Sequence, residues 1–432
     1  MRSGTRAYYI LLFGWLSLVL WIEFAVDLHL ATDGSYYFVS IVDDKWFTDF
    51  DWGRVHSTYL TQWLLYLATV GGVTSIPALK FCFAGGIYSM YVLSMVSCLY
   101  AVRNECPRLL LFPILSIAAV NLPASYTLYG ETQPAALLAW PVLLLLLRSN
   151  IWTKTDGVLL CGLAFLWMRT YQGISIAALI CALVAIHRFF SSRQGPTRFF
   201  LVVFIVIQAF HICTALGGAL YPRDPSNAGA FLRSSLETVA SLPFAVSIFF
   251  LTLIVGGSLW GMKRGVIASL TALGLCFALR LWITHQGYTA EIPSASFSFG
   301  YRTAIATVLP LLMIGAILFA RREFEVPVEA FRLALLFLTL STLYQAKMTW
   351  EWDQFRELYR ATLARSSGYV PVEKTPMYGS PSGWGWVNPM LSVIWSGPVV
   401  RSVVLNPENV GWQPYDPREH RPLSKFLRYE LP

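Results

Sequence analysis

The sequence predicts an all-α polytopic membrane protein with about 11 transmembrane helices and a small extracytoplasmic C-terminal α+β segment. Hydrophobic residues make up 56% of the chain and charged residues 13%, which is about half the charged share of an ordinary soluble domain. Aromatic residues reach 15%, as expected where rings line membrane interfaces. This composition argues against a soluble globular chain, because such a chain needs far more polar surface.

Apolar runs along the chain are the candidate membrane spans, since roughly 20 apolar residues cross a bilayer. The candidates are Ala7–Val26, Ala78–Ala101, Leu109–Asn121, Pro134–Leu147, Gly157–Met168, Gly173–Ile186, Phe199–Leu220, Thr238–Trp260, Val266–Thr284, Thr303–Ala320 and Glu329–Tyr344. Several in the first half are shorter than a full span. We expect these to use flanking aromatic residues, or to be helices broken around a polar cavity.

Lysine and arginine residues in the short loops predict the orientation, because cytosolic loops carry more of them. With the N-terminus in the cytosol, the cations on that side are Arg103, Arg108, Arg148, Lys154, Arg188, Arg193, Arg198, Lys263, Arg264, Arg321 and Arg322. The opposite loops hold most of the carboxylates. An odd number of spans then divides the chain into a transmembrane module, residues 1–345, and an extracytoplasmic C-terminal domain, residues 346–432.

The net charge of +8 is therefore expected to face membrane lipids, whose cytosolic head groups are anionic. No basic patch with interleaved aromatic residues indicates a nucleic-acid partner. Asn-X-Ser/Thr sequons are absent from the sequence, which fits a multi-pass protein of a bacterial inner (plasma) membrane.

The first outer loop, residues 27–77, carries the clearest functional signal. Six carboxylates, among them Asp27 and Asp33, follow the first span within about 25 residues, and an Asp at membrane depth costs on the order of 3 kcal/mol. Asp33 precedes Gly34 and an aromatic run, so a helix returning to the membrane would hold it at the interface. Asp27 and Asp33 are the candidate catalytic residues. Thr58–Val70 is expected to lie along the interface as an amphipathic helix, with Trp63, Leu64 and Leu67 facing lipid.

The other acids of this loop have a simpler interpretation, in which they only solvate it. They are Asp43, Asp44, Asp49 and Asp51.

Polar side chains near the outer ends of several spans are the candidates for substrate binding. They are Glu131, Arg169, Tyr171, Gln172, Arg223, His285 and Arg302. A lone arginine at a helix end is usually a cap or an interfacial anchor. Together these residues would surround one outward-facing cavity that suits an anionic lipid phosphate beside a general base.

The layout resembles the GT-C superfamily of membrane glycosyltransferases, which use polyprenyl-phosphate-linked sugars. The resemblance lies in a first helix, an acidic outer loop, an interfacial helix, many further spans and an outer C-terminal domain. Locally it covers the stretch DGSYYF, where family members often carry an Asp-Glu pair ahead of an aromatic residue. Gly34 stands at the position of the second acid.

The resemblance implies transfer of a sugar from a polyprenyl-phosphate donor to a glycan or lipid acceptor, with inversion at the anomeric carbon. Asp33 would act as the base, and Arg169 with Arg302 would hold the phosphate. Glu131 or Asp27 would assist, or would bind a divalent cation if the reaction needs one. The sequence does not identify a metal ligand set.

Two other function classes remain open from the sequence. A lipid-sugar flippase or other transporter usually shows two halves of similar hydropathy, which this chain lacks. A membrane O-acyltransferase would need a histidine beside a span, and His29, His187 and His211 are available. His211 stands alone in an apolar helix, where a buried histidine with satisfied hydrogen bonds is the usual finding.

The C-terminal segment is predicted to open with an amphipathic helix, Trp350–Ala364, and to contain a short strand, Val399–Leu405. Trp384, Trp386 and Trp412 either stack on sugar rings or pack a small core that has no disulfides.

Overall fold

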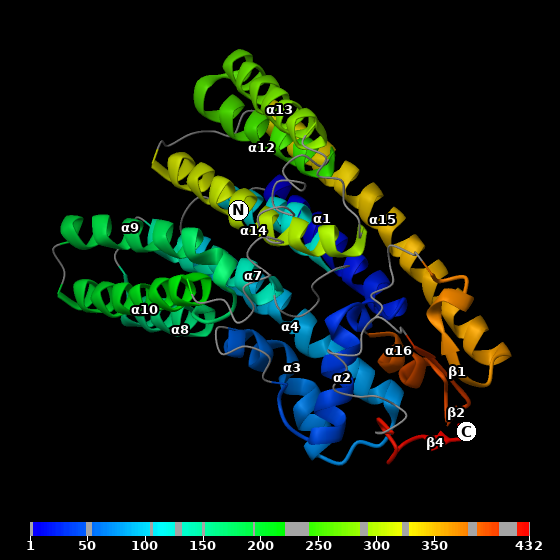
Figure 1. The fold of residues 1–432 in the computed structure, drawn as a ribbon. Coiled ribbons are helices and arrows are strands. Elements are labelled where there is room, and N and C mark those ends of the chain that lie inside the picture. The colour runs from blue at the N-terminus through cyan, green and yellow to red at the C-terminus, as the bar shows by residue number, and fades with distance from the viewer. Residues whose placement is uncertain are drawn as a thin grey trace.

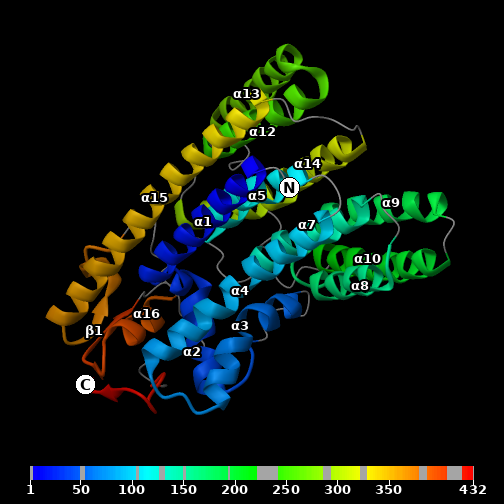
Figure 2. The ribbon, with the colours of Figure 1, turned by 180° about the vertical axis from the view of Figure 1, so that it is seen from behind.

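The computed structural model is largely helical in the part of the chain that it describes (Figure 1 and Figure 2). That part consists of residues 3–48, 54–103, 107–125, 132–148, 152–192, 195–220, 242–285, 293–321, 328–378, 387–405 and 421–431.

The main helices are α1 (Ser3–Ala25), α2 (Asp33–Asp44), α3 (Val55–Val70), α4 (Ile76–Val102), α5 (Leu111–Ser116), α6 (Leu122–Ala124), α7 (Thr132–Leu147), α8 (Lys154–Trp167), α9 (Ser175–Ser191), α10 (Gly195–Leu220), α12 (Leu242–Trp260), α13 (Met262–His285), α14 (Pro293–Arg321), α15 (Val328–Arg365) and α16 (Asn388–Trp395). The short 3-10 helices are η1 (Leu28–Leu30), η3 (Pro107–Leu110), η5 (Gln172–Ile174) and η6 (Val372–Lys374), and η4 (Ile117–Asn121) is a short π-helix. The strands are β1 (Gly368–Pro371), β2 (Val399–Val400), β3 (Ser402–Leu405) and β4 (Arg428–Tyr429).

Three helices in the described part of the chain are long and apolar enough to cross a membrane: α4, α10 over Gly195–Ala215 and α13 over Met262–Leu279. Shorter apolar helices include Thr132–Leu147. Large apolar side chains point away from the protein along these helices; Phe81 on α4 is 64% exposed and Leu275 on α13 is 67% exposed. Rows of such residues are typical of a surface covered by lipid. The structure thus supports a mostly helical, membrane-associated protein.

Helix α7 lies at the centre of the main hydrophobic core. Every residue from Thr132 to Leu146 is buried, because the sequence is apolar on all faces of the helix. Helices α4, α8, α9 and α14 pack around it. The indole nitrogen of Trp167 on α8 donates a hydrogen bond to the carbonyl of Ala135 at 2.7 Å.

Helix α15 continues through the position where the sequence predicted a break. A span ending at Tyr344 and a separate helix from Trp350 were expected, but one helix of 38 residues is found. The residues between, 345–349, include neither Gly nor Pro, so nothing interrupts the hydrogen-bond ladder. At 1.5 Å per residue this helix is about 57 Å long, roughly twice the thickness of a bilayer's hydrocarbon core.

Helices α1 and α15 lie side by side and run in the same direction (Figure 1 and Figure 2). The indole nitrogen of Trp15 donates to Thr342 Oγ1 at 2.7 Å. Further along both helices, Gln345 Nε2 donates to Glu23 Oε1 at 2.8 Å. The end of α1 and the second half of α15 therefore emerge on the same side of the bundle.

The C-terminal segment packs on the region that follows α1. One hydrophobic core joins Phe38 and Ile41 of α2 with Trp352 and Tyr359 of α15 and with Trp395 of α16. Strand β1 pairs in parallel with β3, and β2 pairs in parallel with β4. The strand expected at Val399–Leu405 corresponds to β2 and β3. Trp384, Trp386 and Trp412, together with Asp49 and Asp51, lie outside the described residues.

A carboxylate of α2 binds the last part of the chain. Both oxygens of Asp43 accept a hydrogen bond from the backbone N–H of Leu423, each at 3.0 Å. Burial raises the pKa of Asp43 to about 6, although this hydrogen bond acts in the opposite direction. Because the folded-state pKa lies above the unfolded value, this group stabilises the fold below about pH 4, and the contribution is lost as the pH rises through about 6.

We therefore expect Asp43→Asn to remove one source of pH dependence. Relative to the variant, the wild-type protein should lose thermal stability between about pH 4 and pH 6. Thermal unfolding of both proteins in detergent across this range measures the difference. Parallel pH profiles would contradict the assignment.

Candidate functional site

The turn between α1 and α2 carries both candidate catalytic carboxylates and an unusual backbone. Asp27 follows α1, and Asp33 is the first residue of α2. Asp27 has φ 57° and Thr32 has φ 49°, in the region that non-glycine residues avoid. Each such residue costs on the order of 1–3 kcal/mol. Strain of this kind, held by well-packed surroundings, suggests a functional turn.

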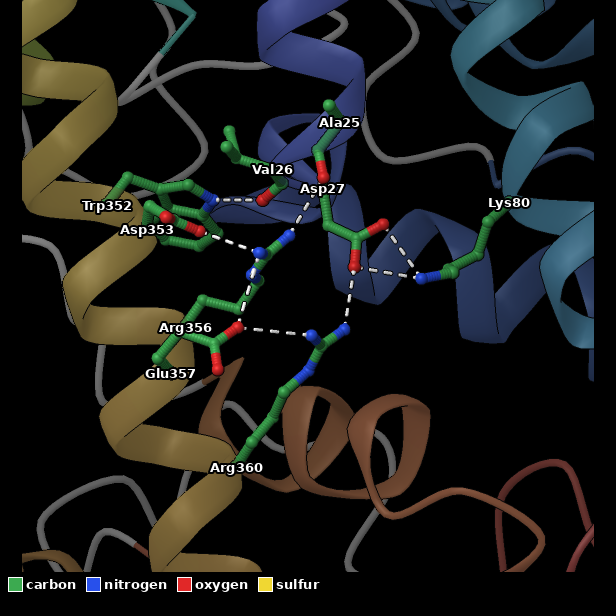
Figure 3. Close-up of polar contacts among 9 residues, drawn as sticks. All are labelled: Ala25, Val26, Asp27, Lys80, Trp352, Asp353, Arg356, Glu357 and Arg360. Carbon is green, nitrogen blue, oxygen red and sulfur yellow. Dashed lines mark hydrogen bonds and ion pairs between the residues drawn. The ribbon is translucent and has the colours of Figure 1, made fainter.

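Asp27 lies between two cations from distant parts of the chain (Figure 3). Lys80 Nζ, in the first turns of α4, contacts both Asp27 oxygens at 2.8 and 2.9 Å. Arg360 Nη2, from α15, contacts Asp27 Oδ2 at 3.2 Å. We refer to these three residues as the Asp27 cluster.

The second half of α15 also holds the end of α1. Trp352 Nε1 donates to the carbonyl of Val26 at 2.9 Å, and Arg356 Nη1 donates to the carbonyl of Ala25 at 3.0 Å (Figure 3). The last carbonyls of a helix have no partner within it, so these donors complete the end of α1. Glu357 Oε1 lies 3.4 Å from Arg360 Nη1 and 3.3 Å from Arg356 Nη2. The acid thereby helps to orient Arg360.

The charges around Asp27 keep it ionised. Burial alone would raise the pKa of Asp27, but Lys80 and Arg360 outweigh burial and leave the pKa below its usual value. The Asp27 cluster consequently carries one net positive charge. The nearest other acid, Glu357, is more than half exposed, so solvent screens much of its effect.

Close packing between His29 and Gly34 explains why the stretch DGSYYF has glycine, and not a second acid, directly after Asp33. The ring of His29 is fully buried and stacks on Phe24 at 5.9 Å, and burial lowers the pKa of His29 to about 3. A Cβ at position 34 would lie 2.1 Å from the backbone oxygen of His29. Only glycine fits such a close approach, so this turn excludes a second carboxylate at position 34.

Asp33 begins α2, and its neighbour Gly34 approaches the face of α4 that carries Lys80. It is half-buried at the N-terminus of α2, where the helix dipole favours a negative charge. Its neighbour Gly34 approaches Phe83, whose ring also lies 6.1 Å from that of His29. Phe83 is three residues after Lys80 on α4, and residues at this spacing share a helix face.

Arg169 and Tyr171 lie elsewhere, at the opposite end of α3. The backbone oxygen of Arg169 accepts a hydrogen bond from the N–H of His56 at 3.3 Å. The guanidinium of Arg54 lies 5.2 Å from the centre of the Tyr171 ring. Helices α3 and α4 pack against each other with Gly86 on Thr61, so Lys80 lies near the other end of α3, on the order of 15 Å from His56 along the helix. Among the candidates that the structure describes, Arg169 and Tyr171 thus lie apart from the Asp27 cluster.

Several candidates fall outside what the structure describes. Glu131 and Arg223 lie outside the described residues, as do the side chains of Gln172 in η5, His285 at the end of α13 and Arg302 in α14. Among the described residues, no group of three His, Cys, Asp or Glu side chains is arranged to hold a metal ion.

Sequence reasoning missed Lys80 and Arg360. A signal for Lys80 was present, because it is a lone cation at the start of an apolar span, and such residues are usually functional. Arg360 had no such signal, since its partner is 333 residues away. Comparison of the chain with protein-family models, with curated proteins and with solved structures finds no match.

Proposed function

We propose that this protein is a membrane glycosyltransferase that moves a sugar from a polyprenyl-phosphate-linked donor to an extracytoplasmic hydroxyl group. The observation that carries the proposal is the Asp27 cluster. It is a net-positive, partly buried group at the point where α1 ends and the apolar helix α4 begins, and Asp33 opens the helix α2 that follows. Paired cations are suited to a lipid phosphate, and the nearby carboxylate is suited to act as a base.

The proposal keeps a transmembrane arrangement of about 11 spans, and the position of a second ionic group supports α4 as one of them. At the far end of α4, Asp156 contacts Arg148 at 2.7 Å and Arg103 at 3.7 Å. Lys80 and Arg103 are about 35 Å apart along the helix, close to the roughly 30 Å hydrocarbon core of a bilayer. The end with the arginines is assigned to the cytosol, and the Asp27 cluster and the C-terminal segment to the outer face.

The proposed reaction uses this chain's residues in distinct roles. Asp33 accepts the proton of the acceptor hydroxyl as its oxygen forms a bond to the anomeric carbon. The bond from that carbon to the phosphate oxygen breaks on the opposite face, so the configuration inverts. Polyprenyl phosphate leaves with the electron pair, and Lys80 and Arg360 stabilise the charge that it gains. Asp27 holds these two cations in place.

A transporter of such lipids is the second candidate, because a carboxylate lies within the bundle. Glu23 on α1 is fully buried, and Gln345 donates to it at 2.8 Å. Ionisable residues at membrane depth often mark transport pathways. A transporter would bind the same lipid but would not transfer the sugar.

Binding of the donor lipid is the first test. Short-chain polyprenyl phosphates, with and without a sugar, should raise the thermal stability of the purified protein in detergent; at 100 times the dissociation constant the gain is about 2.7 kcal/mol. Lys80→Met and Arg360→Gln should each weaken binding by about tenfold or more, since each removes a charged hydrogen bond. Lys347, whose side chain is 65% exposed and pairs with Glu351, provides the control Lys347→Met. If no polyprenyl phosphate changes the thermal stability of the protein, the proposal loses its basis.

A further inference from the structure

A second group of polar side chains lies in the bundle where α10 faces the α8–α9 loop and the start of α3. Gln208 and His211, one turn apart on α10, are 0% and 1% exposed. They occupy the same buried stripe as the apolar residues Leu201, Phe204 and Ala215. Among the described residues, the amide of Gln208 has no hydrogen-bond partner, and neither ring nitrogen of His211 makes a hydrogen bond of good geometry.

The surroundings of this pair come from three segments. The ring of His211 meets that of Trp167, at the end of α8, edge-on at 5.6 Å. Its one polar contact among the described residues is a weak hydrogen bond with the backbone of Tyr171, and it lies within electrostatic range of His56. Helix α10 packs directly on η5, which follows Tyr171. We call Gln208, His211, His56, Arg169 and Tyr171 the Gln208 cluster.

The arrangement is costly to the fold. A buried polar group without a partner loses its hydrogen bonds to water and gains nothing in return. Within the described part of the chain, Gln208 is such a group, and His211 beside it has only the weak contact with Tyr171; leucine or phenylalanine would pack on this face at no such cost. The backbone of Arg169 adds strain, with φ 59°. Several features that lower the stability of the fold, gathered in one place, are expected where the residues bind a ligand.

The chemistry of the Gln208 cluster defines the class of ligand. An amide and neutral imidazoles both donate and accept hydrogen bonds, as sugar hydroxyls do. Trp167 and Tyr171 add aromatic surface, and Arg169 adds a cation suited to phosphate. Burial lowers the pKa of His56, and Arg169 lowers it further, so this ring is neutral at pH 7.

We infer that the Gln208 cluster binds the head group of a phosphorylated sugar, at a site separate from the Asp27 cluster. The choice of a sugar ligand rests on the proposed function; the existence of the site does not. Two polar sites about 15 Å apart along α3 suit a protein that handles two substrates, one held at each site.

Replacing Gln208 by Leu separates a binding role from a purely structural one. The variant removes an unpartnered amide and keeps similar volume, so the melting temperature of the ligand-free protein should rise. Binding of sugar 1-phosphates, measured by calorimetry in detergent, should weaken at least tenfold. Free sugars and inorganic phosphate, tested alongside, should bind more weakly than the sugar phosphate to the wild-type protein.

Two further variants serve as control and second test. Gln62 is equally buried, but its Oε1 accepts a hydrogen bond from the N–H of Thr48 at 3.1 Å. Gln62→Leu should therefore lower the melting temperature and leave sugar-phosphate binding unchanged. His211→Phe keeps a ring against Trp167 and removes both nitrogens, and it should weaken binding even if Gln208→Leu fails to fold.

The outcomes distinguish this inference from the proposed function. Binding that is lost in Gln208→Leu and His211→Phe but retained in Lys80→Met supports a separate site, whether or not the protein transfers sugar. Loss only in Lys80→Met assigns the ligand to the Asp27 cluster and overturns the inference. No binding by the wild-type protein to any hexose, hexosamine or pentose 1-phosphate also overturns it, as does equal binding of inorganic phosphate alone.

Discussion

Replacing Asp33 by Asn is expected to lower the rate of sugar transfer by about 10²- to 10⁴-fold, the usual contribution of a general base. Asparagine has nearly the same shape but cannot accept a proton from the attacking hydroxyl. Asp33 is half-buried at the first position of α2, where an amide is also tolerated, so the fold should remain. The measurement is transfer from a short-chain polyprenyl-phosphate sugar, with the melting temperature followed in parallel.

The acid at the other end of the same helix provides the control. Asp44 is exposed at the end of α2, and Asp44→Asn should transfer sugar at the wild-type rate. If Asp33→Asn binds the lipid and retains transfer, Asp33 is not the base. If the wild-type protein binds the lipid but transfers nothing under any condition, the transporter becomes the better assignment.

Local features of the sequence predicted many individual helices well. The run Ala78–Ala101 corresponds to α4 (Ile76–Val102), and Pro134–Leu147 corresponds to α7 (Thr132–Leu147). The amphipathic segment Thr58–Val70 corresponds to α3 (Val55–Val70). These helices are determined by apolar patterning and by nearby breakers, both of which are local. Trp63 and Leu67, expected to face lipid, are 40% and 54% exposed.

Contacts between distant segments could not be predicted in the same way. Apolar periodicity shows which face of a helix is buried, but it does not show which other helix covers that face. Arg169 was expected beside Asp33 because both were assigned to the outer ends of spans. In the structure Arg169 lies beside the start of α3, and Arg360 contacts Asp27. That contact depends on α15 extending well beyond the bundle, and the change in composition after Tyr344 concealed this extension.

The buried ion pair at the other end of the bundle gives the largest expected effect on stability. Asp156 Oδ1 lies 2.7 Å from Arg148 Nη1, and the two side chains are 0% and 3% exposed. Its other oxygen accepts hydrogen bonds from the N–H and Oγ1 of Thr153, both at 2.8 Å, which closes a capping box at the start of α8. Tyr100 on α4 donates to Oδ1 at 3.0 Å. One carboxylate therefore connects α4, α7 and α8.

Asp156→Ala should lower the free energy of unfolding by about 3–5 kcal/mol, because it leaves the Arg148 guanidinium buried without its partner. Lys154→Ala, at an exposed position two residues earlier, controls for changes at the start of α8 and should have little effect. Asp156→Asn should fall between the two, since the amide can still accept the capping hydrogen bonds but carries no charge. Unfolding of the three variants in detergent shows the order of their stabilities. Equal stability of Asp156→Ala and Lys154→Ala would mean that the connection among α4, α7 and α8 does not depend on this ion pair.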